Sequence, residues 1–186
     1  MSAIEGLAKN SDLRRRILFT LFVLAVYRMG VHVPTPGVDG ASVMAFFQAQ
    51  RKGIFGLFNT FTGGALQQFS VFALGIMPYI SSSIIFQLLQ STIPYLEALK
   101  KEGEHGRRKI NQYTRYGTVV LSFVQGYAIS NWLLHSTSPD GHPLVLSPNV
   151  GFLPFQVMTI ITLTAGTCFI MWLGEQITER GIDNGS

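Results

Sequence analysis

The sequence predicts an all-α, polytopic membrane helix bundle. Three observations support this fold class. None of the 44 positions 53–96 holds Asp, Glu, Lys, Arg or His. Long apolar runs alternate with polar or charged connections, and the cations gather on alternate connections. Hydrophobic residues make up 47% of the chain and charged residues 13%, a composition typical of membrane proteins rather than soluble domains.

The uncharged stretch is too long to be one membrane span. The hydrocarbon core is roughly 30 Å thick and needs about 20 helical residues, whereas 44 residues at ~1.5 Å each would reach about 66 Å. Gly63-Gly64 is the expected break. We therefore expect a re-entrant segment, 54–68, and a full span, 69–93, kinked at Pro78. Because non-helical backbone at membrane depth must be enclosed by protein or line a wet cavity, the break predicts a cavity.

The other segments follow in order along the chain. Residues 1–16 are predicted to be cytoplasmic and carry no signal-peptide pattern. The first span, 17–33, follows three arginines and is ended by Pro34 and Pro36. After it we expect an outer loop with a short amphipathic segment (34–53), then the broken stretch, a charged cytoplasmic loop (94–115), a third span (116–135), an outer loop (136–150), a fourth span (151–173) and a cytoplasmic tail (174–186).

The positions of the cations give the orientation. With the N-terminus inside, eleven of the fourteen Lys and Arg lie on inner segments, and the outer segments hold Arg51 and Lys52. This satisfies the positive-inside rule, so the net charge of +4 needs no nucleic acid to explain it. The alternative that these cations bind a cytoplasmic partner such as a ribosome stays open. The remaining cation, Arg28, lies within the first span, where it is either part of a functional site or reaches the outer interface.

One face of the expected span 69–93 changes from apolar to polar. Its positions, four and three residues apart, are Phe69, Ala73, Ile76, Ile80, Ser83, Gln87 and Gln90. One interpretation is a wet inner vestibule closed at mid-membrane by aliphatic side chains, a constriction that gates by dewetting. The other is a polar stripe used for hydrogen bonds between helices. Gln125 in the third span is a candidate partner for Gln87.

The sequence predicts neither catalysis nor a metal site. The membrane zone has no carboxylate pair and no His-Glu spacing, and the serines at 81–83 lack an evident base. Gly63-Gly64 is not followed by the Lys-Ser or Lys-Thr of a phosphate loop. Cys168 is expected to be a buried, inert thiol, and no cofactor is predicted.

Three blocks of sequence resemble bacterial SecY, the channel subunit of the protein-conducting translocon. GGA at 63–65 and FALGIMPYIS at 72–81 resemble its second transmembrane segment. KKEGE, GRRKI and QYTR between 100 and 115 resemble its second cytoplasmic loop, and WLGEQITERGI at 172–182 resembles the segment entering its fifth helix. The ending departs from the family pattern, which would place a small residue at Asp183 and an aliphatic one between Gly185 and Ser186, and the abrupt stop suggests a fragment.

The resemblance implies an hourglass channel in a clamshell of helices, of which this chain offers the first four and the approach to the fifth. It makes Ile76 and Ile80 contributors to the pore ring. It assigns a plug to Gly63, Gly64, Ala65, Leu66, Gln67, Gln68, Phe69, Ser70, Val71 and Phe72. It assigns the lateral gate and vestibule to Ser83, Gln87, Gln90 and Gln125, and a cytoplasmic partner contact to Lys100, Lys101, Arg107, Arg108, Lys109 and Arg115.

The resemblance also implies partners and a location. These are SecE- and SecG-like small subunits, a SecA-type motor ATPase or a ribosome, signal sequences and nascent polypeptides, and the lipid of the bacterial plasma membrane. The expected function is to pass unfolded secretory polypeptides across that membrane and to release hydrophobic segments laterally. Half of an ion-coupled secondary transporter is the alternative, because such proteins also use broken helices; a structural scaffold is a third interpretation.

Overall fold

The computed structural model describes residues 10–50 and 52–181. Its helices are α2 (Ser11–Val31), α3 (Gly40–Ala49), α4 (Ile54–Phe61), α5 (Met77–Thr92), α6 (Pro94–Lys101), α7 (Glu104–His135) and α8 (Phe155–Arg180). A small antiparallel hairpin of β1 (Asn149–Val150) and β2 (Leu153–Pro154) precedes α8. The predicted all-α class is confirmed.

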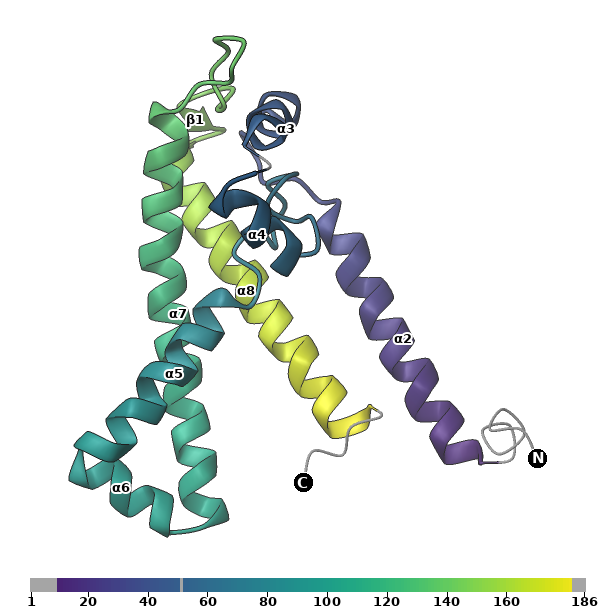
Figure 1. Cartoon of the computed structure of the whole chain (residues 1–186), viewed down its shortest axis with the longest axis vertical. Helices are drawn as coiled ribbons and strands as arrows, with labels where there is room; N and C mark the ends of the chain where they lie inside the picture. The colour runs from purple at the N-terminus through teal and green to yellow at the C-terminus, as the bar shows by residue number, and fades with distance from the viewer. Residues whose placement is uncertain (1–9, 51, 182–186) are drawn as a thin grey trace.

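The elements sort into two ends of an elongated molecule. The start of α2, the α6–α7 turn and the end of α8 lie at one end, and α3 and the hairpin lie at the other (Figure 1). The long helix α7 packs against both α5 and α8, and α2 packs against α8. The described parts of the three segments predicted to be cytoplasmic therefore lie at the same end of the molecule.

Small side chains allow α7 to approach its neighbours closely. Its buried residues recur mostly four apart: Gly106, Ile110, Thr114, Thr118, Ser122, Gly126, Ser130 and Leu133. Ser82 on α5 donates a 2.7 Å hydrogen bond from Oγ to the carbonyl oxygen of Thr114. Directly beside it, a Cβ on Gly117 would lie 2.5 Å from the Ser82 hydroxyl. Stripes of small residues are how membrane helices bring their backbones together.

Residues 62–76, here the turn segment, form a wedge between α2 and α8. Towards the end with the chain termini, Arg16 Nη1 donates to the Gly181 carbonyl oxygen at 3.4 Å, so α2 and α8 are close there. Further along, the turn segment lies between the two helices (Figure 1). A Cβ on Gly30 of α2 would collide with the Phe72 ring, and one on Gly166 of α8 would collide with the Val71 carbonyl. Glycine at these two positions makes room for the wedge.

The helix expected over residues 69–93 forms only from Met77 to Thr92, so that helical boundary was wrong. Pro78 lies in the first turn of α5, where its missing N–H costs nothing, so it starts the helix instead of kinking it. Before it, Phe69 and Gly75 adopt φ angles of 44° and 56°. These left-handed conformations interrupt any helix.

The segment 94–115, expected as a loop, is also helical. Pro94 begins α6, and α7 begins at Glu104, well before the expected 116. Gly103, with φ 73°, makes the tight turn between them. The two helices bury Leu96, Leu99 and Ile110 against each other. The charged residues therefore stand on a packed helical hairpin.

The remaining helices agree more closely with expectation. α3 lies within the predicted outer loop 34–53. α8 begins at Phe155, four residues after the start of the predicted fourth span 151–173, and continues beyond it to Arg180. In the described part of the chain, α8 is the one helix whose length and mean hydropathy, 1.8, are sufficient for crossing a membrane. Residues 182–186, where the sequence departs from the family pattern, lie outside the described residues.

Candidate functional site

The predicted break at Gly63-Gly64 is confirmed. α4 ends at Phe61, and the two glycines adopt φ angles of 60° and 90°, which glycine tolerates without steric cost. Asn59 then ties the returning chain to the helix. Its Oδ1 accepts from the Gln67 backbone N–H at 3.0 Å, and its Nδ2 donates to Gln67 Oε1 at 3.1 Å.

The predicted plug residues divide by burial. Ala65, Phe69, Ser70 and Phe72 are buried, whereas Gly63, Gly64, Leu66, Gln67, Gln68 and Val71 are exposed or half-buried. Two backbone hydrogen bonds of 3.0 Å fix the later part. The Val71 N–H donates to Val33, and the Thr35 N–H donates to Phe69. The later part is therefore paired with the chain that leaves α2.

Phe72 is the centre of an aromatic stack that joins α2 to α8. Its ring centroid lies 5.4 Å from that of Tyr27, at 3° between planes, and 6.0 Å from that of Phe169, at 11°. Only 4% of Phe72 is exposed. Such pairs add to the free energy gained from burial alone, so Phe72 anchors the turn segment to both helices.

Arg28 and its neighbour Tyr27 bind the backbone where α4 ends. Arg28 Nη1 donates to the Gly63 carbonyl oxygen at 3.0 Å, and Tyr27 Oη donates to the Thr62 carbonyl oxygen at 2.9 Å. Arg28 is exposed, the Gly63 carbonyl is the partner that the structure gives it, and both roles open for Arg28 stay predictions. Tyr27 was missed, because a tyrosine in an apolar run carries no signal of its hydrogen-bond partner.

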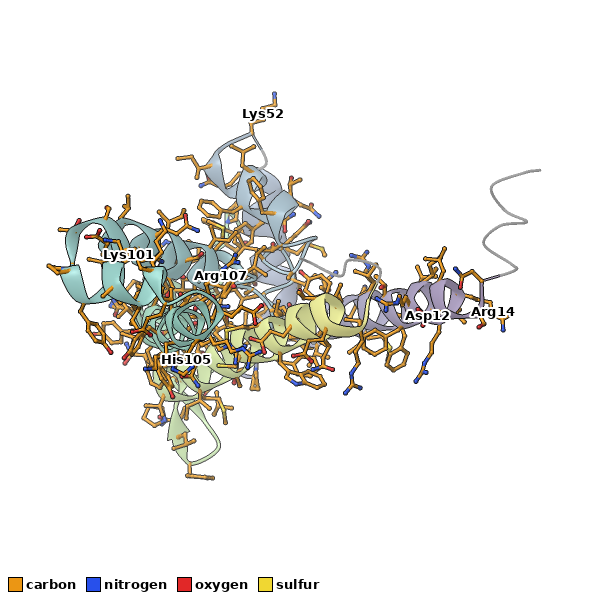
Figure 2. All side chains as sticks on the ribbon, turned by 90° about the horizontal axis from the view of Figure 1, so that it is seen from below. Asp12, Arg14, Lys52, Lys101, His105 and Arg107 are labelled. Atoms are coloured by element: carbon orange, nitrogen blue, oxygen red, sulfur yellow. The ribbon has the colours of Figure 1, made fainter. Side chains whose placement is uncertain are left out.

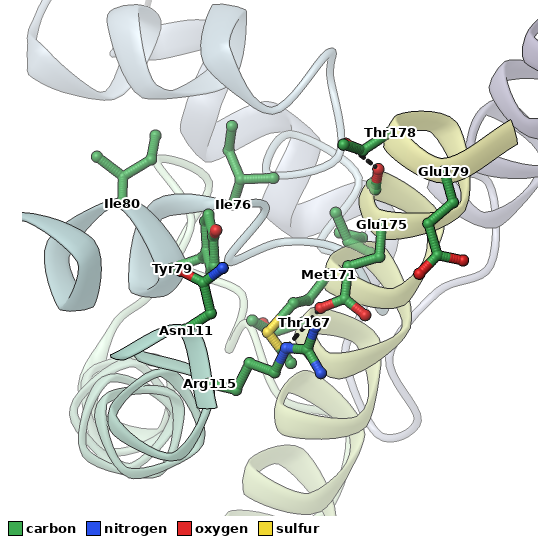
Figure 3. A pocket seen from close by; sticks show the side chains of 12 residues that line it. Ile76, Tyr79, Ile80, Asn111, Arg115, Thr167, Met171, Glu175, Thr178 and Glu179 are labelled. Atoms are coloured by element: carbon green, nitrogen blue, oxygen red, sulfur yellow. Dashed lines mark hydrogen bonds and ion pairs between the residues drawn. The ribbon is translucent and has the colours of Figure 1, made fainter. Parts of the chain in front are cut away.

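The two predicted pore residues line one cavity of about 500 Å³. Ile76 and Ile80 are 48% and 39% exposed, and they stand with Tyr79 on the α5 side (Figure 3). The other walls come from α7 and α8 and are more polar: Asn111, Arg115, Thr167, Ile170, Met171, Gly174, Glu175, Thr178 and Glu179. The cavity thus combines an aliphatic wall with a charged one.

An ion pair crosses the charged wall. Arg115 Nε of α7 lies 2.7 Å from Glu175 Oε1 of α8 (Figure 3). Arg115, predicted as a partner contact, therefore lines the cavity and connects two helices. Thr167 is 2% exposed in the same wall, and its hydroxyl has no hydrogen-bond partner among the described residues.

The predicted gate and vestibule residues do not gather at one place. Gln87 Nε2 donates to Ser83 Oγ at 3.4 Å on the exposed face of α5, and Gln90 lies one turn further along. Gln125 lines a separate apolar cavity of about 460 Å³, beside Met77 and Ser81. The expected Gln87–Gln125 pair does not form. With Ser82 level with Thr114, the two glutamines are about 24 Å apart along the helices.

The basic end of the molecule is held on the α6–α7 hairpin. Lys101 pairs with Glu97 at 2.7 Å and Arg108 with Glu104 at 3.9 Å, while Lys100 and Arg107 are exposed and Lys109 is half-buried. Figure 2, seen from this end, shows Lys101 and Arg107 on one side of the molecule and Arg14, at the start of α2, on the other side. Exposed pairs of this kind contribute at most about 1 kcal/mol and leave the cations accessible to a partner. The described residues include no group of three or more potential metal ligands.

Comparison with known proteins gives a consistent result. Residues 70–186 match the family model described as SecY. The protein translocase subunit SecY of Streptomyces scabiei is 47% identical over 192 aligned residues, which cover 100% of this chain and 43% of the relative. That of Escherichia coli K12 is 52% identical over 174 residues, covering 94% and 38%, and that of Aquifex aeolicus is 42% identical over 184 residues, covering 98% and 42%. The chain spans about two fifths of the length of these curated relatives.

Proposed function

The chain belongs to the SecY family, and from this premise we propose that it supplies part of a protein-conducting channel. The full-length channel would pass unfolded secretory polypeptides across the bacterial plasma membrane. It would also release sufficiently hydrophobic segments laterally into the lipid. The names of the relatives, all protein translocase subunits, support this role.

One observation carries the proposal. The uncharged stretch is broken into the short helix α4 and the turn segment, the turn segment packs between α2 and α8, and its last residue, Ile76, is exposed beside a cavity. Backbone of this kind at membrane depth requires protein around it. We propose that α4 and the chain up to Gln68 act as a stopper in the outer half of the channel, and that residues 69–72 anchor it. The predicted plug thus has a movable part and a fixed part.

Ile76 and Ile80 form this chain's share of the channel neck, which residues elsewhere in the full-length protein complete. An aliphatic neck offers ions neither charge nor donors to replace their hydration, and it closes by dewetting. The polar face of α5 below it, Ser83, Gln87 and Gln90, lines the wet inner vestibule and the lateral gate.

Lateral release needs no energy source within this chain. Each Leu, Ile, Phe or Val at the centre of a span favours insertion into lipid by about 0.3–0.6 kcal/mol, whereas each central charge opposes insertion by about 2.5–3.5 kcal/mol. Over about 15 apolar residues the gain reaches several kcal/mol. A segment in the channel can therefore partition by its own composition.

We propose that a partner drives transport across the membrane. We propose that the α6–α7 hairpin contacts an anionic surface of a SecA-type motor or a ribosome through Lys100, Lys101, Arg107, Arg108 and Lys109. SecE- and SecG-like subunits would complete the complex. We propose that this side and the N-terminus face the cytoplasm, which the distribution of Lys and Arg supports through the positive-inside rule.

The test is the ion conductance of the full-length protein in lipid vesicles after Ile54–Phe61 is replaced by a short Gly-Ser linker. A channel that loses its stopper should leak ions. A secondary transporter should instead lose uptake without a leak, and that result would contradict the proposal. The matched control replaces the exposed loop around Asp140 and Gly141 with the same linker and should leave conductance unchanged.

A second test addresses the neck. Ile76→Asn with Ile80→Asn should improve export of substrates with weak signal sequences, because a polar ring hydrates and opens more easily. Ile85→Asn is the matched control, since Ile85 is similarly exposed, at 44%, but lies on the opposite face of α5 from Ile76. A scaffold would show altered stability with no change in export.

A further inference from the structure

Two neighbouring side chains of α2 bind the point where α4 ends. Tyr27 donates to the carbonyl of Thr62 at 2.9 Å, and Arg28 donates to the carbonyl of Gly63 at 3.0 Å. These are the first and second residues after the last helical residue, Phe61. We name Tyr27 and Arg28 together the α2 latch.

The positive charge of Arg28 adds an electrostatic contribution to this contact. The residue lies within the first predicted span, where a charged side chain is costly unless it pairs with another group such as a backbone carbonyl. The C-terminal end of a helix carries a partial negative charge that attracts cations. If α4 moved away, both the guanidinium and the Gly63 carbonyl would lose a charge-assisted hydrogen bond.

Beside the latch, Gly64 adopts a left-handed backbone conformation, and Asn59 of α4 is hydrogen-bonded across it to Gln67. Gly64 has φ 90°, and a Cβ built there would meet no atom within 4 Å. Beyond Gln68, the chain is fixed by the Val71–Val33 hydrogen bond and by the stack around Phe72. α4 on the near side exposes Leu57 and Phe61. Movement of α4 with the chain up to Gln68 keeps the Asn59–Gln67 hydrogen bonds and leaves the part anchored at residues 69–72 in place.

We infer that the α2 latch holds the channel closed: Tyr27 and Arg28 fix the end of α4, and opening requires that both hydrogen bonds break. The inference rests on the proposed function. Tyr27 and Arg28 act as positioning residues, because they hold the stopper and do not line the neck.

The experiment measures passive ion leak through the full-length channel in lipid vesicles. Arg28→Met should raise the leak about tenfold or more, because a hydrogen bond from a charged group is lost, and Tyr27→Phe should raise it about fivefold. Arg28→Lys should give an intermediate leak, since the charge stays but the planar donor is lost. Met29→Ala is the control: Met29 is 72% exposed on the next position of α2 and should leave the leak unchanged.

The same substitutions are then made in the channel whose α4 is replaced by a linker. This background shows whether the leak comes from loss of the latch or from general destabilisation of the protein. In that background Arg28→Met should add no further leak, and an added leak would overturn the inference. If the channel with α4 replaced leaks ions but the Arg28→Met and Tyr27→Phe channels do not, the inference about the α2 latch is wrong. The proposal that α4 acts as a stopper is then still supported. If α4 replacement does not leak, the proposed function itself fails. Should Arg28→Met fail to assemble, Tyr27→Phe, which keeps the ring, decides the question.

Discussion

α4 and the turn segment are adjacent parts of one uncharged stretch, yet they are held in opposite ways. α4 has regular hydrogen bonds but exposes its apolar side chains, with Phe61 74% exposed. The turn segment has no regular structure but contributes Ala65, Phe69 and Phe72 to the buried core. The difference teaches that burial, rather than regular secondary structure, determines which part of this stretch is fixed.

The sharpest way to break this comparison is to remove one aromatic ring from each part. Phe72→Ala should lower the free energy of unfolding of the full-length protein by about 3–5 kcal/mol, because it empties the stack between α2 and α8. Phe61→Ala should change it by less than about 0.5 kcal/mol, as an exposed position. Denaturant titration in mixed micelles measures both. Equal effects would mean that the two parts are held alike.

The packing of the turn segment against α8 can be tested by adding one methyl group to α8. Gly166→Ala would place a Cβ against the backbone carbonyl of Val71, which cannot move like a flexible side chain. We expect a loss of about 2–3 kcal/mol in the same titration. Gly174→Ala on the same helix is the matched control, because nothing lies within 4 Å of its Cβ position. If Gly166→Ala were tolerated as well as Gly174→Ala, the turn segment would not be packed on α8.

The joint between the two parts should be sensitive to backbone conformation alone. Gly64→Ala meets no neighbour but must adopt φ 90°, which should cost about 1–2 kcal/mol. Gly53→Ala at the start of α4, where φ is −102°, should cost nothing measurable through this cause. A neutral Gly64→Ala would show that the left-handed turn is not required.

The smallest effect is expected at α3, which covers the turn segment through Val43 and Phe47. Asp39 caps α3, and the hydroxyl of Ser42, 2.6 Å away, lowers the pKa of its carboxyl from the ordinary value of 3.8. The stabilisation is therefore complete above that value and is lost as the pH falls through the lowered pKa. Asp39→Ala should cost about 1 kcal/mol at pH 7 and remove this acid dependence. Asp140→Ala in the exposed outer loop is the control.

The need for a break in the uncharged stretch 53–96 and the position of that break could both be predicted from the sequence, because they depend on local chemistry. The length of the uncharged run forces a break, and Gly63-Gly64 is where the chain leaves the helical conformation. The distribution of cations predicted one side of the membrane for three segments whose described residues lie at the same end of the molecule. Ile76 and Ile80, which the resemblance assigns to the pore ring, are exposed and line a cavity, and their role in a pore stays a prediction.

The errors arose where different structures share one sequence pattern. A buried turn and a buried helix are both continuously apolar, so residues 69–76 were expected to be helical. The charges of residues 94–115 suggested a loop, although Lys, Arg and Glu are good helix formers and only Gly103 ends the helix. Hydrogen bonds from Tyr27 and Arg28 to residues 35 positions away depend on the tertiary fold, and sequence periodicity does not report them.

The Ser82–Gly117 contact has a mechanical consequence. At this level Ser82 donates across the contact to the Thr114 carbonyl oxygen, and a Cβ on Gly117 would collide with Ser82 and Phe86. Sliding of α5 along α7 would therefore break the hydrogen bond or bring the helices into collision. In a gate that contains α5 and α7, the two helices would move together as one rigid body. Space for an incoming hydrophobic segment would then have to open at a different helix–helix contact.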